Sequence, residues 1–290
     1  MSPQLLELLD SATSRLSTFS DTPQLDAQVL LSHVLGRTRT WLIAHADLPS
    51  DPDHVTRLEA FVRRLEQGEP LPYVLGHHEF FGLDFDLTPD VLIPRPETEL
   101  LLQNAITWLE AAADRRTIAD IGTGSGCIAV CIAVHVPDAH ILATDISLPA
   151  LQVARANARK FGVSDRIEFM ECDILPPHTE SLTTEQHLDL ICANLPYIPT
   201  AELEALPIFG REPRLALDGG QDGLDPFRRF FRVVPQWMAA GGLMLLEIEA
   251  KGGPPVLSLA FDAFHAAAIH LHQDAAGRDR LLEIQLNGLS

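Results

Sequence analysis

The stretch Thr-Ile-Ala-Asp-Ile-Gly-Thr-Gly-Ser-Gly, residues 117–126, decides the fold. Its first half is a short apolar run typical of a buried strand, and residues 125–134 have the apolar composition of a buried helix. The glycines between them let the backbone turn sharply and approach a ligand closely. A strand, a glycine-rich turn and a helix in this order predict a ligand at the carboxyl end of the strand, over the helix N-terminus.

The same alternation continues toward the C-terminus. We predict strands at residues 117–121, 140–144, 166–172, 188–193 and 243–248. Helices are predicted between them, at residues 125–134, 147–161 and 225–238. A terminal antiparallel pair of strands is expected at residues 266–271 and 280–285. Strands that alternate with helices favour a parallel sheet with helices on both faces. We therefore expect an α/β fold with a mostly parallel, seven-stranded sheet.

The residues before the glycine-rich turn have a different pattern. Apolar residues recur at helical spacing over residues 2–68, whereas residues 79–87 alternate around a glycine, as in a hairpin. A helix is expected over residues 97–113. A chain of 290 residues has room for two domains. The predicted organisation is a small all-helical domain, a β-hairpin linker and an α/β domain, at residues 1–75, 76–95 and 96–290.

Composition restricts the classes of function. Forty acidic against 21 basic residues give a net charge of −19, which disfavours direct binding of a nucleic acid. No apolar run reaches the roughly 18 residues of a membrane span, and the N-terminus lacks the features of a secretory signal. We therefore expect a cytoplasmic protein without membrane contact. The four cysteines read as reduced core thiols, and the 12 histidines have no zinc spacing, so no metal is predicted.

Acidic residues follow the next two predicted strands. Asp145, 23 residues after Gly122, stands where a carboxylate can hold both ribose hydroxyls, and Asp173 stands where it can reach an adenine amino group. Cys127 occupies the position of the third glycine of a dinucleotide fingerprint. S-adenosylmethionine fits this pattern because it has no pyrophosphate that a third glycine turn would cradle.

The fourth predicted strand ends at Asn194-Leu195-Pro196-Tyr197, called the tetrad below. The Asn194 side-chain oxygen and the Leu195 carbonyl can each accept an N–H hydrogen bond from a planar amide or amino group, which stabilises positive charge that develops on its nitrogen. Pro196 restrains the preceding residue to an extended conformation, and Tyr197 can stack on a planar acceptor. The tetrad predicts methylation of such a nitrogen; the alternative is an Asn-Xaa-Pro turn that merely ends a strand.

Further segments share their order and spacing with a known family. They are residues 72–76, 80–82, 92–99, 120–126, 194–197, 212–224 and 277–280. On these segments the chain resembles the release factor glutamine methyltransferases (PrmC, formerly HemK). The resemblance implies a helical N-terminal domain that docks the partner, followed in the sequence by a Rossmann-like class I methyltransferase domain. It also implies methyl transfer from S-adenosylmethionine to the glutamine amide in the Gly-Gly-Gln motif of peptide-chain release factors. We expect the chain to act as a monomer.

The family's functional positions carry over to residues of this chain. The implied cofactor-binding residues are Gly122, Thr123, Gly124, Ser125, Gly126, Asp145, Asp173, Ile174 and Asn194. Asn194, Pro196 and Tyr197 are the implied catalytic residues, and the whole tetrad, Arg95 and Glu97 are expected to hold the substrate. Three residues depart from the family pattern: Leu195 replaces a usual proline, Ile174 a frequent aromatic and Glu249 a typical glycine.

Two other functions compete with this interpretation. The Asn-Leu-Pro-Tyr form is typical of enzymes that methylate adenine in ribosomal RNA, because the adenine amino group has the same chemistry. Those enzymes have the cofactor loop near the N-terminus and a basic surface, whereas here the glycine-rich turn begins at Gly122 and the net charge is −19. The second alternative is a catalytically inactive module that binds release factors; the intact tetrad argues against it.

Overall fold

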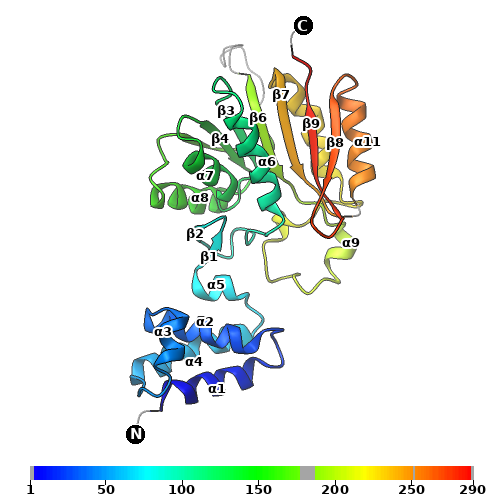
Figure 1. Cartoon of the computed structure of the whole chain (residues 1–290). Helices are drawn as coiled ribbons and strands as arrows, with labels where there is room; N and C mark the ends of the chain where they lie inside the picture. The colour runs from blue at the N-terminus through cyan, green and yellow to red at the C-terminus, as the bar shows by residue number, and fades with distance from the viewer. Residues whose placement is uncertain (1–2, 177–186, 251, 289–290) are drawn as a thin grey trace. The chain divides into compact units, whose positions relative to one another are not determined.

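The chain contains two compact units, Met1–His77 and His78–Ser290 (Figure 1). The structure is a computed structural model, and it describes residues 3–176, 187–250 and 252–288. Each unit has its own hydrophobic core. The predicted three-part division with a separate linker at residues 76–95 stays a prediction.

The first unit is helical in its described residues. Its helices are α1 (Leu5–Leu16), α2 (Pro23–Leu35), α3 (Arg39–Ala44), α4 (Pro52–Glu66) and α5 (Leu71–Leu75). Their apolar stripes, among them Leu8 and Leu16 of α1 and Leu30 of α2, form one buried cluster. Arg15 joins α1 to α4 through ion pairs of 2.8 Å with Glu59 and Glu66.

The second unit is built on a seven-stranded sheet. After the hairpin of β1 (His77–Phe80) and β2 (Leu83–Asp86), the sheet strands are β3 (Thr117–Ile121), β4 (His140–Asp145), β5 (Ile167–Glu171), β6 (Leu188–Asn194), β7 (Met238–Glu247), β8 (Ala268–Gln273) and β9 (Asp279–Gln285). Their order is β5-β4-β3-β6-β7-β9-β8. The strands β5, β4, β3, β6 and β7 are parallel to one another, and β9 pairs antiparallel with both β7 and β8. The predicted mostly parallel sheet with a terminal antiparallel pair is confirmed.

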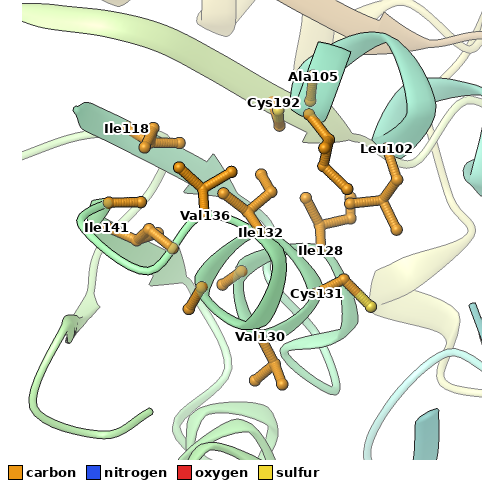
Figure 2. Packing of buried hydrophobic residues seen from close by; sticks show 14 of the residues in the cluster. Leu102, Ala105, Ile118, Ile128, Val130, Cys131, Ile132, Val136, Ile141 and Cys192 are labelled. Atoms are coloured by element: carbon orange, nitrogen blue, oxygen red, sulfur yellow. The ribbon is translucent and has the colours of Figure 1, made fainter. Parts of the chain in front are cut away.

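Helices cover both faces of this sheet. One face packs against α6 (Thr98–Glu110), α7 (Cys127–His135) and α8 (Leu148–Lys160), and the other against α10 (Asp225–Val233) and α11 (Gly253–Ala263). Successive strand residues point to opposite faces, so Ile118 joins the first cluster and Ala119 the second. Figure 2 shows Ile118 and Ile141 of the sheet against α7 in the first cluster. Short helical segments complete the unit: α9 (Thr200–Leu203), η1 (Arg214–Ala216) and η2 (Val234–Gln236).

Three elements differ from the sequence prediction. The helix predicted over residues 225–238 ends as α10 at Val233 and continues as the 3-10 turn η2, because Pro235 has no N–H to donate. The strand β7 then begins at Met238 and not at residue 243. No helix is predicted at Gly253–Ala263, yet α11 forms there, since its two prolines stand in the first turn, where no N–H is needed.

Candidate active site

The strand order creates a crevice at the carboxyl ends of β3 and β6. Chain connections leave these neighbouring strands in opposite directions along the sheet, which is the topological switch point where α/β sheets bind ligands. Ile121 is opposite Ala193 in the parallel register. Gly122, which directly follows β3, and Asn194, the last residue of β6, therefore come side by side.

A pocket opens at this crevice and gathers most of the predicted site residues. The predicted residues that line it are Gly122, Thr123, Gly124, Ser125, Asp145, Asp173, Ile174, Asn194, Leu195, Pro196 and Arg95. Gly126, Tyr197 and Glu97 are not among the lining residues. Residues predicted separately as a cofactor loop and an acceptor tetrad thus face a common space.

The glycine-rich turn brings backbone atoms directly to the pocket. Gly122 and Gly124 have φ values of 71° and 55°, which residues with a Cβ rarely adopt. The Gly122 and Thr123 N–H groups donate to the Thr144 carbonyl at 2.8 and 2.9 Å, which fixes the turn to β4. A Cβ on Gly122 would lie 3.8 Å from the Leu195 side chain. The absent side chain at Gly122 therefore keeps this part of the pocket open between loop and tetrad.

Gly126 has a different place from the other glycines of the motif. A Cβ built on it would lie 3.0 Å from Ala154 Cβ, and its φ is +80°. Gly126 is buried at the start of α7, whereas Ala154 belongs to α8. Its missing side chain permits close packing of the two helices.

The Asp145 side chain is held in place by backbone N–H groups. Its carboxylate accepts the Gly124 N–H at 2.9 Å and the Ser147 N–H at 2.8 Å, one on each oxygen. Burial raises the pKa of Asp145, and the two backbone hydrogen bonds oppose that rise. Each carboxylate oxygen retains a lone pair for a further donor. This geometry suits a ligand diol that donates two hydroxyl hydrogens.

Asp173 and Ile174, which follow β5, also line the pocket. Asp173 is exposed and forms an ion pair of 3.0 Å with Arg229, so part of its carboxylate is already used. Ile174 has a φ of 65°, unusual for a β-branched residue, and its carbonyl accepts the Thr144 hydroxyl at 2.6 Å. That bond anchors Ile174 to β4, and its side chain borders the pocket.

Asp120 was not included among the predicted site residues. It is fully buried at 0% exposure, and its Oδ2 accepts the Thr123 hydroxyl at 2.6 Å and the Ala129 N–H at 3.1 Å. Its Oδ1 has no hydrogen-bond partner among the described residues. Burial raises the pKa of Asp120 to about 7. The signal that could have identified it in the sequence is an acid inside an otherwise apolar strand.

Asn194 presents an unused acceptor at the end of β6. Its Nδ2 donates to the Thr98 hydroxyl at 3.3 Å. Within the described parts of the chain, no group donates a hydrogen bond to Asn194 Oδ1 or to the Leu195 carbonyl oxygen. Both residues line the pocket. The two oxygen atoms predicted to grip a substrate amide are thus available in the structure.

The residues after the tetrad are braced by the segment at residues 212–224. Ile198 forms a parallel bridge with Asp218, and the Gly219 N–H donates to the Ile198 carbonyl at 2.8 Å. A Cβ on Gly223 would lie within 2.4 Å of the Tyr197 carbonyl, so glycine is required for this approach. Burial raises the pKa of Tyr197 to about 12, so its phenol stays protonated at neutral pH.

The proline-rich segment before α6 is tied to the same brace. Glu212 has a side chain only 4% exposed; it accepts the Ile93 N–H at 3.1 Å and pairs with Arg95 at 2.6 Å. Glu97 lies 3.9 Å from the Arg280 guanidinium. Arg95 thus reaches the pocket, whereas Glu97 pairs with Arg280 and does not line it.

Two kinds of feature are absent from the described residues. No cluster of three or more His, Cys, Asp or Glu side chains in the described ranges is arranged to hold a metal ion. None of the described helices combines the length and apolar character that crossing a bilayer requires.

The strand order, the glycine-rich turn at the switch point and the pocket beside it define a class I methyltransferase fold. Models of two protein families match the chain. The PrmC N-terminal domain matches residues 7–76, and the methyltransferase small domain matches residues 96–205.

Curated relatives extend the match to nearly the whole length. The release factor glutamine methyltransferase of Moorella thermoacetica is 41% identical over 278 residues, which cover 95% of this chain and 96% of the relative. That of Geobacter sulfurreducens is 38% identical over 264 residues, 90% of this chain and 89% of the relative. The chain belongs to the release factor glutamine methyltransferase family.

Solved structures agree with this fold. A methyltransferase from Pyrococcus furiosus superposes with a TM-score of 0.51 at 17% identity, covering 72% of this chain and 91% of that structure. At this identity the likeness concerns the fold alone. The family assignment therefore rests on the sequence relatives.

Proposed function

We propose that this protein transfers a methyl group from S-adenosylmethionine to the side-chain amide nitrogen of the glutamine in the Gly-Gly-Gln motif of peptide-chain release factors. The proposal rests on membership of the family and on one observation of the site. That observation is the pair of free acceptors, Asn194 Oδ1 and the Leu195 carbonyl, which lie beside the glycine-rich turn. The relatives from Moorella thermoacetica and Geobacter sulfurreducens are release factor glutamine methyltransferases.

The pocket has the charge and the hydrogen-bonding groups that S-adenosylmethionine requires. Asp145 offers two carboxylate oxygens for the ribose hydroxyls, and the turn at Gly122 and Gly124 gives room for close backbone approach. Asp120 carries a buried oxygen without a partner behind that turn. This concentration of carboxylates suits a cofactor with a sulfonium and an ammonium group. It would repel the pyrophosphate of a dinucleotide.

Asp173 and Ile174 are proposed to border the adenine. Asp173 lines the pocket, although it shares its carboxylate with Arg229. Ile174 supplies an apolar surface where a ring can lie. We propose that the cofactor touches Gly122 to Ser125 directly and that Gly126 supports the turn through packing on Ala154.

The tetrad explains how an unreactive amide can accept a methyl group. When bound, S-adenosylmethionine would supply an electrophilic methyl group, which the amide nitrogen would accept while sulfur would keep the electron pair of the broken bond. Asn194 Oδ1 and the Leu195 carbonyl each accept an N–H hydrogen bond and hold the nitrogen in line. They also stabilise the positive charge that develops on it. The surplus proton leaves the nitrogen for water.

The remaining substrate contacts follow from the walls of the pocket. Arg95 is proposed to meet the peptide backbone of the motif at the pocket rim, because Glu212 orients its guanidinium. Pro196 shapes the floor beside the amide, and Tyr197 holds the tetrad through its braced backbone. Release factors act in translation, so the cytoplasm is the proposed location. The monomeric state stays a prediction.

The test is methyl transfer to a purified release factor. The protein is incubated with methyl-labelled S-adenosylmethionine and a release factor, and label is counted in the peptide that carries the Gly-Gly-Gln motif. We expect stoichiometric labelling of that glutamine. A release factor with glutamate at this position is the matched control, because it lacks the amide nitrogen and must stay unlabelled. Equal labelling of both proteins, or labelling of ribosomal RNA in their place, would contradict the proposal.

A further inference from the structure

The Asn194 carboxamide has two orientations that differ by a half-turn, and only one of them presents its oxygen to a substrate. The substrate nitrogen must meet Oδ1, because an Nδ2 in that position would repel the N–H groups it should accept. The mechanism therefore needs something that selects the orientation. Two residues that are not among the predicted site residues, Thr98 and Glu247, lie next to the side chain, and Thr98 also lines the pocket.

Register and helix position bring these residues to Asn194. Glu247 ends β7 and pairs with Asn194, the last residue of β6, in the parallel register. Thr98 is the first residue of α6. The two side chains belong to residues only 2% and 3% exposed, so water does not compete freely for their hydrogen bonds. Neither residue has a role in the mechanism proposed above.

The hydrogen bonds among the three side chains run in one direction. The Thr98 hydroxyl donates to Glu247 Oε2 at 2.5 Å. Its single proton is then committed, so Thr98 Oγ1 can only accept from Asn194, and Nδ2 donates to it at 3.3 Å. Asn194 also lowers the pKa of Glu247, as an amide N–H aimed at the carboxylate would.

We propose that Thr98 and Glu247 are positioning residues that lock Asn194 with its oxygen toward the substrate amide. This inference rests on the proposed function. An ionised carboxylate can only accept hydrogen bonds, so it sets the direction of the whole chain of donors. A flipped Asn194 would place its oxygen against two acceptors and leave buried groups unpaired.

The chain of hydrogen bonds from Asn194 through Thr98 to Glu247, called the relay below, requires the ionised form of Glu247. Burial raises the pKa of Glu247 to about 7; the Thr98 and Asn194 hydrogen bonds and Arg280 oppose the rise, and Glu97 adds to it. Tyr197 and Cys127 also face this charge and remain neutral, because burial raises the pKa of each to about 12. Below pH 7 the protonated Glu247 carboxyl can itself donate a hydrogen bond, so it no longer fixes the direction of the hydrogen bonds to Thr98 and Asn194. Turnover should therefore fall as the pH drops through about 7.

The variants E247Q and T98V test the relay in the full chain with cofactor and release factor. Glutamine can donate or accept, and valine does neither, so each variant frees the Asn194 amide to flip. We expect kcat to fall about 10- to 100-fold, with the KM for the release factor and the cofactor dissociation constant changed less than about threefold. T98S restores the hydroxyl and should keep most of the activity. E247Q should also lose the fall in kcat near pH 7.

Matched controls make the same chemical changes elsewhere. E283Q alters a carboxylate of β9 that pairs with His272, and T107V alters an exposed hydroxyl of α6 that bonds to Gln103. Both should keep wild-type kinetics. The double variant E247Q/T98V should be no slower than the worse single variant, since both changes break one relay. Additive losses would overturn the proposal.

A second readout does not depend on turnover. In the wild type, the Asn194 side-chain NH₂ resonance should titrate with a midpoint near pH 7, and this titration should vanish in E247Q. An unaltered kcat in E247Q, a matching loss of cofactor affinity, or an NH₂ resonance insensitive to pH would each overturn the relay. If wild-type protein leaves release factor unmethylated, the proposed function fails, whereas the titration still reports on the relay.

Discussion

The two sides of the pocket are constructed differently. On the cofactor side, Asp145 is held by two backbone N–H groups, that of Ser147 two residues away and that of Gly124 in the glycine-rich turn, 21 residues away. On the acceptor side, Asn194 is held by Thr98, 96 residues away, and through it by Glu247. One side is thus built from backbone hydrogen bonds of two turns. The other is a side chain oriented by tertiary structure, so substitutions on the two sides should have different effects.

The largest effect is expected on the acceptor side. Asn194→Ala removes one of the two acceptors that stabilise the charge on nitrogen, and we expect methyl transfer to fall by at least about 10²–10³-fold. Cofactor affinity, measured by calorimetry, should change by no more than a few-fold. Asn287→Ala, which removes an exposed amide bonded to Ala266, is the control and should be silent. Full turnover by Asn194→Ala would discard the mechanism.

The next effect concerns the fold beneath the cofactor side. Gly126→Ala should lower the free energy of unfolding by about 2–4 kcal/mol, because it combines a left-handed backbone with a contact against α8. Gly162→Ala has a similar φ of +69° with nothing within 4 Å, and should lose only about 1–2 kcal/mol. Chemical denaturation measures both. Equal losses would show that packing on Ala154 is not what requires glycine at position 126.

A smaller effect is expected for cofactor affinity. Asp145→Ala removes the two carboxylate oxygens proposed to hold the ribose, and should weaken S-adenosylmethionine binding by about 1–3 kcal/mol. Once cofactor is saturating, kcat should stay within a few-fold of wild type. This is the reverse of the expected Asn194→Ala result. Unchanged affinity in calorimetry would remove Asp145 from the site.

The smallest effect is expected at Asp173. Its side chain is exposed and already pairs with Arg229, so Asp173→Ala should weaken cofactor binding by less than about 1 kcal/mol. The comparison with Asp145→Ala uses the same titration. A loss at Asp173 as large as that at Asp145 would mean that the ion pair opens and the carboxylate binds the adenine directly.

The contrast between the two sides also explains what the sequence could predict. The turn at residues 122–125 and Asp145 were found because glycine spacing and an acid at a strand end are local patterns. Asn194 was found because it begins a recognisable tetrad. Thr98 and Glu247 were missed, since their importance arises from the pairing of β6 with β7 and from the start of α6 beside them. No local pattern encodes those contacts.

Burial was equally hard to infer. Asp120 was read as part of the glycine-rich motif, yet its unpaired oxygen becomes evident only when the strand is seen inside the sheet. Gly126 belongs to the cofactor loop in the sequence, whereas its spatial neighbour Ala154 comes from α8, the helix that follows β4. The fold itself was predicted well, because alternating strands and helices specify a parallel sheet. Its exceptions, at α10 and α11, arise from prolines whose effect depends on their position in a helix.

The central claim is that two oxygens of the tetrad grip the substrate amide. The most direct measurement is a crystal structure of this protein with S-adenosylhomocysteine and a release factor. We expect Asn194 Oδ1 and the Leu195 carbonyl within hydrogen-bond distance of the motif glutamine nitrogen, with that nitrogen facing the cofactor sulfur. An Asn194 side chain turned away from the glutamine, or a glutamine bound outside the pocket at Gly122, would contradict the account.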